Sequence, residues 1–192
     1  MKIVGIFAVV ENALLSVQYN DGNEHEFARV FKQWSDLEYL EDFFETHRAD
    51  LQSEYYRKIK GLITVEQAVL QTLDEAEDFE YDIKQIAETG KGKDEETLHD
   101  YIFHPLHKND SRILHQESKA YGSEKSSWLR LYAIRIAPNL YVISGGAIKL
   151  TKKMQERDHT ALELKKLKLV EEHLKTIGFE QADDYGFIEI GE

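Results

Sequence analysis

The chain of 192 residues contains no cysteine. Without thiols it can form no disulfide, no thiolate nucleophile and no cysteine-ligated zinc or iron–sulfur site, and a reducing cytoplasm is the simplest location for such a protein. The sequence also lacks any window of roughly 18 consecutive apolar residues, the length that a membrane span requires. We therefore expect a soluble, cytoplasmic protein that does not interact with membranes.

We expect no secretory signal at the start of the sequence. The first ten residues, MKIVGIFAVV, carry one lysine and a short apolar run, but Glu11 and Asn12 follow where a cleavage site needs small residues. Because alternation of apolar and polar residues resumes immediately, we interpret this run as a strand.

Familiar catalytic and metal-binding motifs are also missing. There is no HEXXH zinc motif, no G-x-S-x-G nucleophile motif and no glycine-rich loop of the kind that holds phosphates. His99 and His104 are five residues apart, which is off the helical spacing of two ligands on one face, and Pro105 interrupts any helix before His107. The acidic run from Asp74 to Asp82 lacks the ligand spacing and glycine of a calcium loop. We expect no metal and no cofactor, and interpret the three histidines as surface or packing residues.

The net charge of −12 is unevenly distributed along the chain. Residues 1–117 carry a net charge of −13, residues 118–175 carry +6, and residues 176–192 carry −5. A positive segment between two acidic ones indicates an anion-binding face, for which RNA is the obvious ligand. The alternative, which the charge alone favours, is that the helix expected at 158–176 simply exposes its lysines to solvent.

Two strands and two long helices are predicted in the first half of the chain. Residues 2–10 and 13–19 form a hairpin, since β-forming residues lie on either side of Glu11-Asn12. Apolar residues spaced by three and four predict a helix over 25–47, which Ser35-Asp36 can divide in two. They are Phe27, Val30, Phe31, Trp34, Leu37, Leu40, Phe43 and Phe44.

A second helix is predicted from Thr64 to about Thr89. Thr64 is a suitable N-cap with Gln67 at the capping-box position, and Gly90 stands where a helix-ending glycine is expected. The acidic residues of this helix should face solvent. Residues 91–94 read as a polar connector, and 95–107 as either a short helix or an irregular insertion.

Three further strands are predicted at 112–119, 128–137 and 140–145, the last two joined by a tight turn at Pro138-Asn139. A final helix should run over 158–176 and stop at Gly178, and residues 187–190 are a potential edge strand. Strands joined by two-residue turns are antiparallel. We therefore predict a single α+β domain over residues 1–192, with an antiparallel sheet of about five strands packed against helices.

The run LRLYAIRIAPNLYVISGGAIKLTKKMQE, followed by a lysine-rich helix, resembles the C-terminal half of RelE/HigB-like toxins of bacterial toxin–antitoxin systems. In that family an arginine-bearing strand, a tight turn and an apolar strand lead to a pattern like G-F-x-K-K-T-x-K, which residues 146–153 match here. The resemblance covers residues 112–176. It implies a RelE-like core, with residues 1–111 as an N-terminal hairpin and helical insertion and residues 177–192 as an acidic tail.

The resemblance implies a ribosome-associated, metal-independent mRNA endonuclease that a cognate antitoxin restrains. Its partners would then be messenger RNA, the ribosome and the antitoxin. Basic side chains stabilise the transition-state phosphate in such chemistry, and another group moves protons. The implied catalytic residues are Arg130, Arg135, Lys149, Lys153 and His159, with Tyr132 as a further candidate. The implied RNA-binding residues are Lys149, Thr151, Lys152, Lys153 and Arg157.

Structural roles remain open for several of these residues. Arg130 and Arg135 are an odd number of positions apart, so at most one of them can serve a single site. The lysines at 149, 152 and 153 can equally protect a sheet edge, and Gly145-Gly146 can mark a bulge or a close backbone approach. Trp34 and Trp128 are most simply packing residues. A second hypothesis is a non-catalytic protein that keeps the toxin-like sheet as a platform for a protein or an RNA.

Overall fold

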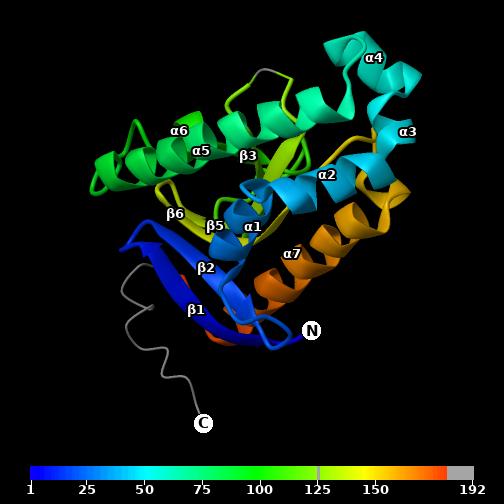
Figure 1. Ribbon diagram of the computed structural model, residues 1–192. Helices are drawn as coiled ribbons and strands as arrows, with labels where there is room; N and C mark the ends of the chain where they lie inside the picture. The colour runs from blue at the N-terminus through cyan, green and yellow to red at the C-terminus, as the bar shows by residue number, and fades with distance from the viewer. Residues whose placement is uncertain (125, 181–192) are drawn as a thin grey trace.

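A computed structural model describes residues 1–124 and 126–180, which form a six-stranded mixed sheet with helices on both faces (Figure 1). The strands are arranged in the order β1-β2-β6-β5-β4-β3. Their bounds are β1 Ile3–Val10, β2 Leu14–Tyr19, β3 Phe103–Pro105, β4 Gln116–Tyr121, β5 Leu129–Ala137 and β6 Leu140–Ile148.

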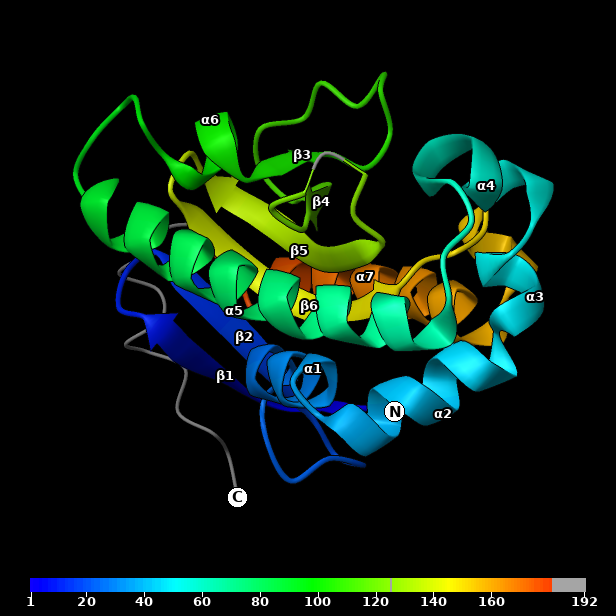
Figure 2. The same ribbon diagram turned by 45° about the horizontal axis from the view of Figure 1, so that its top comes forward.

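The helices divide between the two faces of the sheet. They are α1 Glu26–Trp34, α2 Leu37–Thr46, α3 Arg48–Leu51, α4 Glu54–Lys60, α5 Val65–Thr89, α6 Leu98–Tyr101, the 3₁₀ helix η1 Met154–Glu156 and α7 Asp158–Thr176. Helices α1, α2 and α5 share one apolar cluster with the sheet, and α7 packs on the other face (Figure 2). Trp34 and Trp128 are both buried in the first cluster, as predicted.

Local signals in the sequence place most of these elements correctly. The hairpin of β1 and β2 is confirmed, and so is the division of the helix at Ser35-Asp36, where the Asp36 carboxylate accepts a hydrogen bond from the Tyr39 amide and begins α2. Thr64 and Gln67 form the predicted capping box at the start of α5. The helices α3 and α4 were not among the predicted elements.

The α+β class is confirmed, and the predicted antiparallel sheet of about five strands is found in part: the sheet has six strands, and one of its five pairings is parallel. β2 pairs in parallel with β6 through residues Leu14–Ser16 and Tyr141–Ile143. The rule for two-residue turns does not apply to these strands because most of the chain lies between them. A sixth strand, β3, forms within the segment predicted as a helix or an irregular insertion. Two strand bounds differ most from those predicted. β4 begins at Gln116 and not at residue 112, directly after His115 with its positive φ of 55°, and β6 continues beyond residue 145 to Ile148.

The two consecutive glycines of β6 mark both a bulge and a close approach. The register between β5 and β6 shifts just before Gly145. A Cβ atom on Gly145 would lie 2.1 Å from Oε2 of Glu163, and one on Gly146 would lie 2.9 Å from the carbonyl oxygen of Arg130. Each approach leaves no room for a side chain.

Two charged side chains expected in solvent are buried instead. Lys166 is 6% exposed, although it was assigned to the solvated lysine face of α7, and Glu75 is 3% exposed within the acidic run of α5. Their burial depends on partners from distant elements, which helical spacing cannot reveal. The edge strand predicted at 187–190 lies outside the described residues.

A buried ionic cluster joins α1 to α7. The ammonium group of Lys166 donates to Glu26 at 2.7 Å and to Glu163 at 2.9 Å, and Arg29 donates to both oxygens of Glu26. Nearby, the hydroxyl group of Tyr19 donates to the carbonyl oxygen of Ser144. The cluster therefore connects the helical layers on the two faces of the sheet beside the end of the β2–β6 pairing.

Burial raises the pKa of Glu163 from its ordinary 4.5 to about 7, although Lys166 opposes the shift. One carboxylate oxygen, Oε2, has no hydrogen-bond partner among the described residues. The pKa of Glu163 is higher in the folded protein than in the unfolded chain. The stabilisation that its protonated form contributes is therefore fully present below the pKa of the unfolded chain, and it is lost as the pH rises through about 7.

Above that pH we therefore expect Glu163→Gln to raise the free energy of unfolding, by at most about 3 kcal/mol. The gain should disappear in acid, and urea unfolding over a pH series measures it. Glu26→Gln is the matched control. The paired Glu26 has a lowered pKa, so its loss should destabilise the protein at neutral pH. Equal effects of the two variants would contradict this account.

Candidate phosphate-binding cleft

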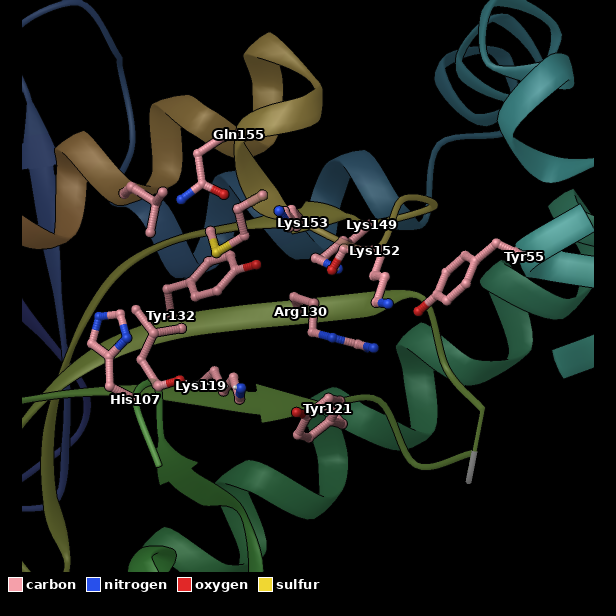
Figure 3. A pocket seen from close by; sticks show the side chains of 13 residues that line it. Tyr55, His107, Lys119, Tyr121, Arg130, Tyr132, Lys149, Lys152, Lys153 and Gln155 are labelled. Atoms are coloured by element: carbon pink, nitrogen blue, oxygen red, sulfur yellow. Dashed lines mark hydrogen bonds between the residues drawn. The ribbon is translucent and has the colours of Figure 1, made fainter. Parts of the chain in front are cut away.

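Positive charge converges on one cleft of about 480 Å³ (Figure 3). The cleft lies over β4 and β5, and the segment after β6 forms another wall. Its cationic lining residues are Lys119, Arg130, Lys149, Lys152 and Lys153. The other lining residues are Tyr55, Leu106, His107, Tyr121, Tyr132, Met154, Gln155 and Leu164. No aspartate or glutamate is among these described residues, although the whole chain has a net charge of −12.

The floor of the cleft is a cross-strand group of four side chains. Lys119 lies opposite Tyr132 in the antiparallel register, and Tyr121 lies opposite Arg130. Residues two apart on a strand share a face, so both strands present a cation and a tyrosine to the same side of the sheet. This arrangement follows from the pairing of β4 with β5, because side chains alternate between the two faces of the sheet along each strand.

Arg130 is a partly buried cation without a carboxylate partner among the described residues. It donates to the carbonyl oxygens of Ser127 at 2.8 Å and Leu129 at 2.7 Å, and its guanidinium carbon lies 4.2 Å from the centroid of the Tyr121 ring. Burial lowers its pKa. These contacts hold the planar group in place, and a phosphate in the cleft would supply the missing negative charge.

Burial in the cleft and the nearby charge of Arg130 both disfavour the charged form of Lys149. Its pKa is lowered to about 8, chiefly by burial and then by the nearby charge of Arg130. The amine donates to the carbonyl oxygens of Thr151 and Lys152. The hydroxyl group of Tyr56, on α4, donates to the Lys149 carbonyl oxygen at 3.2 Å, so α4 is attached to this wall of the cleft.

Tyr132 adds a polar group that the protein itself leaves unsatisfied. Its side chain is 1% exposed, and its hydroxyl group has no hydrogen-bond partner among the described residues. Figure 3 shows the hydroxyl group pointing into the cleft toward the side of Lys153. A buried hydroxyl without a partner is costly, and an anionic oxygen is a suitable acceptor for it.

The structure brings together five of the residues singled out from the sequence: Arg130, Tyr132, Lys149, Lys152 and Lys153 all line the cleft. Thr151 adjoins them but is buried, and its hydroxyl group donates to the Lys153 carbonyl oxygen. The lysine cluster is thus part of a concave surface, where its charge can act on one ligand.

The other three residues lie elsewhere. Arg135 faces the opposite side of β5, as its odd spacing from Arg130 indicates, and lies 3.4 Å from His99. His159 contacts the Ile148 carbonyl oxygen through Nε2, and its ring packs against His47 and Phe43. Arg157 forms an ion pair with Asp50.

Several lining residues were not anticipated from the sequence. Lys119 carries a weak signal, because it ends the strand predicted over 112–119, whereas Tyr121 lies beyond that strand. Tyr55 and His107 carry none, since each comes from a segment between regular elements of the prediction and reaches the cleft only in the folded chain. The positions of Tyr55 and His107 in the cleft thus depend on long-range packing.

The described part of the chain holds no group of three or more His, Cys, Asp or Glu side chains placed to bind a metal ion. Among its helices none is long and apolar enough to cross a membrane. No protein-family model matches the chain, and comparison with curated proteins and with solved structures found no match either. The function is therefore argued from the chemistry of the cleft.

Anion binding should weaken as the pH rises through about 8, because Lys149 then loses its positive charge. A short DNA oligonucleotide is a suitable probe, since its phosphodiesters stay singly charged over this range. We expect a loss of about tenfold in affinity, measured by fluorescence anisotropy. Lys149→Arg should remove the pH step, and an unchanged step in that variant would contradict the assignment.

Proposed function

We propose that this chain is a RelE/HigB-like RNA endonuclease whose active site is the basic cleft. The observation that carries the proposal is the convergence of five cations in a cleft lined by no described carboxylate. Lys152 and Lys153 are exposed, and the other three cations are partly buried. Like charges held close together repel one another, and a ligand of opposite charge relieves that repulsion. A polyanion with closely spaced phosphates is such a ligand.

The chemistry available there needs no metal. The RNA 2′-hydroxyl attacks the adjacent phosphorus, a bond from O2′ to phosphorus forms, and the bond from phosphorus to the 5′-oxygen breaks. Arg130 and the neighbouring lysines stabilise the extra negative charge on the phosphoryl oxygens. A neutral Lys149 amine uses two N–H groups for the carbonyls of Thr151 and Lys152 and keeps a lone pair to accept the 2′-hydroxyl proton.

A RelE-like core is the finer part of the proposal. The antiparallel strands β4, β5 and β6 are consecutive in the chain, and η1 and α7 follow them directly. The matched segment 146–153 forms the end of β6 and the turn into η1, and this turn supplies three of the five cations. The proposal therefore includes the family's partners: messenger RNA on the ribosome, and a cognate antitoxin that covers the site.

A non-catalytic platform is the second candidate, and specific contacts favour it. The amine of Lys149 already bonds two backbone carbonyls, and Arg135, Arg157 and His159 lie outside the cleft. In this case the cleft holds RNA or an acidic protein segment without cutting anything.

Ribosome-dependent cleavage of a labelled message tests the first proposal. We expect wild-type cleavage, and a loss of at least about 100-fold in the Lys149→Ala, Lys153→Ala double variant. The control is Lys91→Ala, Lys93→Ala, which removes the same charge from lysines paired with Glu88 and Glu96 outside the cleft. Equal activity of both double variants would refute the site. Wild-type RNA binding without cleavage would support the platform.

Tyr132→Phe separates ligand binding from folding. Removing an unsatisfied buried hydroxyl should raise the free energy of unfolding by about 1 kcal/mol. The same change should weaken RNA binding about tenfold, because a hydrogen bond to the phosphate is lost. Thermal unfolding and anisotropy measured on one preparation give both values. A destabilised variant with normal affinity would show that the hydroxyl group serves the fold alone.

A further inference from the structure

His107 occupies the end of the cleft beside Tyr132 (Figure 3). It lies in the loop after β3, and this loop is fastened to the sheet where the Leu106 amide donates to the Glu117 carbonyl oxygen at 2.8 Å. The imidazole is mostly exposed, at 65% of its side-chain surface, and so remains accessible to a ligand in the cleft. No other histidine is among the described residues that line this cleft.

A buried carboxylate lies close to the ring. Nε2 of His107 lies 3.3 Å from Oε2 of Glu117, whose side chain is 11% exposed. Glu117 is two positions before Lys119 on β4, so it lies on the face that forms the cleft floor. With Nε2 directed at the carboxylate, Nδ1 is the nitrogen left free for a ligand. A carboxylate that orients an imidazole and stabilises its positive charge is a frequent arrangement in proton transfer.

We propose that His107, positioned by Glu117, is the proton donor to the leaving 5′-oxygen in the RNA cleavage described above. The inference rests on the proposed function and adds the acid that it lacks. As the bond from phosphorus to the 5′-oxygen breaks, the imidazolium gives its proton to that oxygen, while Lys149 takes the proton of the attacking 2′-hydroxyl. The products are a 2′,3′-cyclic phosphate and a free 5′-hydroxyl. The protein loses one proton from His107 and gains one on Lys149.

The surroundings of His107 suit this role. The charged groups near it are Asp110 in its own loop, Glu117 and Lys119 on β4, and the lysines after β6 across the cleft. The ring of Tyr132 on β5 lies beside it, with the hydroxyl group directed away from it toward Lys153. Arg112 engages Asp110 through two hydrogen bonds, which leaves Glu117 as the carboxylate within contact distance of the ring.

The test compares His107→Asn, His107→Ala and Glu117→Gln with the wild type in single-turnover RNA cleavage. We expect both His107 variants to lose at least about 100-fold in the rate constant with little change in RNA affinity, and Glu117→Gln to lose less. The pH profile of His107→Asn should show one ionisation fewer than that of the wild type. Added imidazole should restore activity to His107→Ala, which a purely structural role would not permit.

His104→Asn is the matched control, because His104 is exposed on β3 and does not line the cleft. An active wild type with an unaffected His107→Asn variant would overturn this inference and leave the proposed function standing. The inference is also overturned if His104→Asn loses as much activity as His107→Asn. A wild type that binds RNA but never cuts it would overturn the inference and the endonuclease together.

Discussion

The parallel pairing of β2 with β6, only three residue pairs long, is the constraint on which the rest of the structure depends. β6 lies between β2 and β5, and both α1 and α7 pack against it. Where the backbone pairing ends, side chains continue the connection: Tyr19 bonds the Ser144 carbonyl, and Lys166 joins Glu26 to Glu163. The carboxylate of Glu163 fills the space beside Gly145 that a side chain there would need. The end of β6, and with it the lysines that follow, is fixed by this packing.

The two charge groups of the molecule differ in how they are balanced. In the cluster between α1 and α7, buried cations have carboxylate partners, so the cluster serves the fold. In the cleft, Arg130 bonds carbonyl oxygens and lies over an aromatic ring, with no carboxylate partner among the described residues, and Lys149 is bonded to carbonyls. Carbonyl dipoles orient these cations without neutralising them. The cleft therefore keeps a positive electrostatic potential, although the protein as a whole is acidic.

Features encoded within a few residues could be predicted from the sequence, and features that join distant segments could not. The capping box of Thr64 and Gln67 and the turn at Pro138-Asn139 are local, and both form. Asn139 also bonds the Ala87 carbonyl and the Leu98 amide, which no local pattern reveals. The lysines after β6 were found because they adjoin in sequence, whereas His107 and Tyr55 reach them only through the fold. Lys166 was misplaced for the same reason: a lysine at a helical surface position is buried only if a distant acid meets it.

The attachment of α4 to the cleft has an optical consequence. The hydroxyl group of Tyr56 bonds the backbone of Lys149, and the ammonium group of Lys60 lies 4.2 Å above the indole ring of Trp128. Trp128 is one of only two tryptophans in the chain, and the other, Trp34, lies on α1. If RNA occupies the cleft as proposed and displaces Lys149, the bond through Tyr56 would carry the displacement to α4 and change the position of the charge over that ring. The emission of Trp128 would then report, without an added label, whether the cleft is occupied.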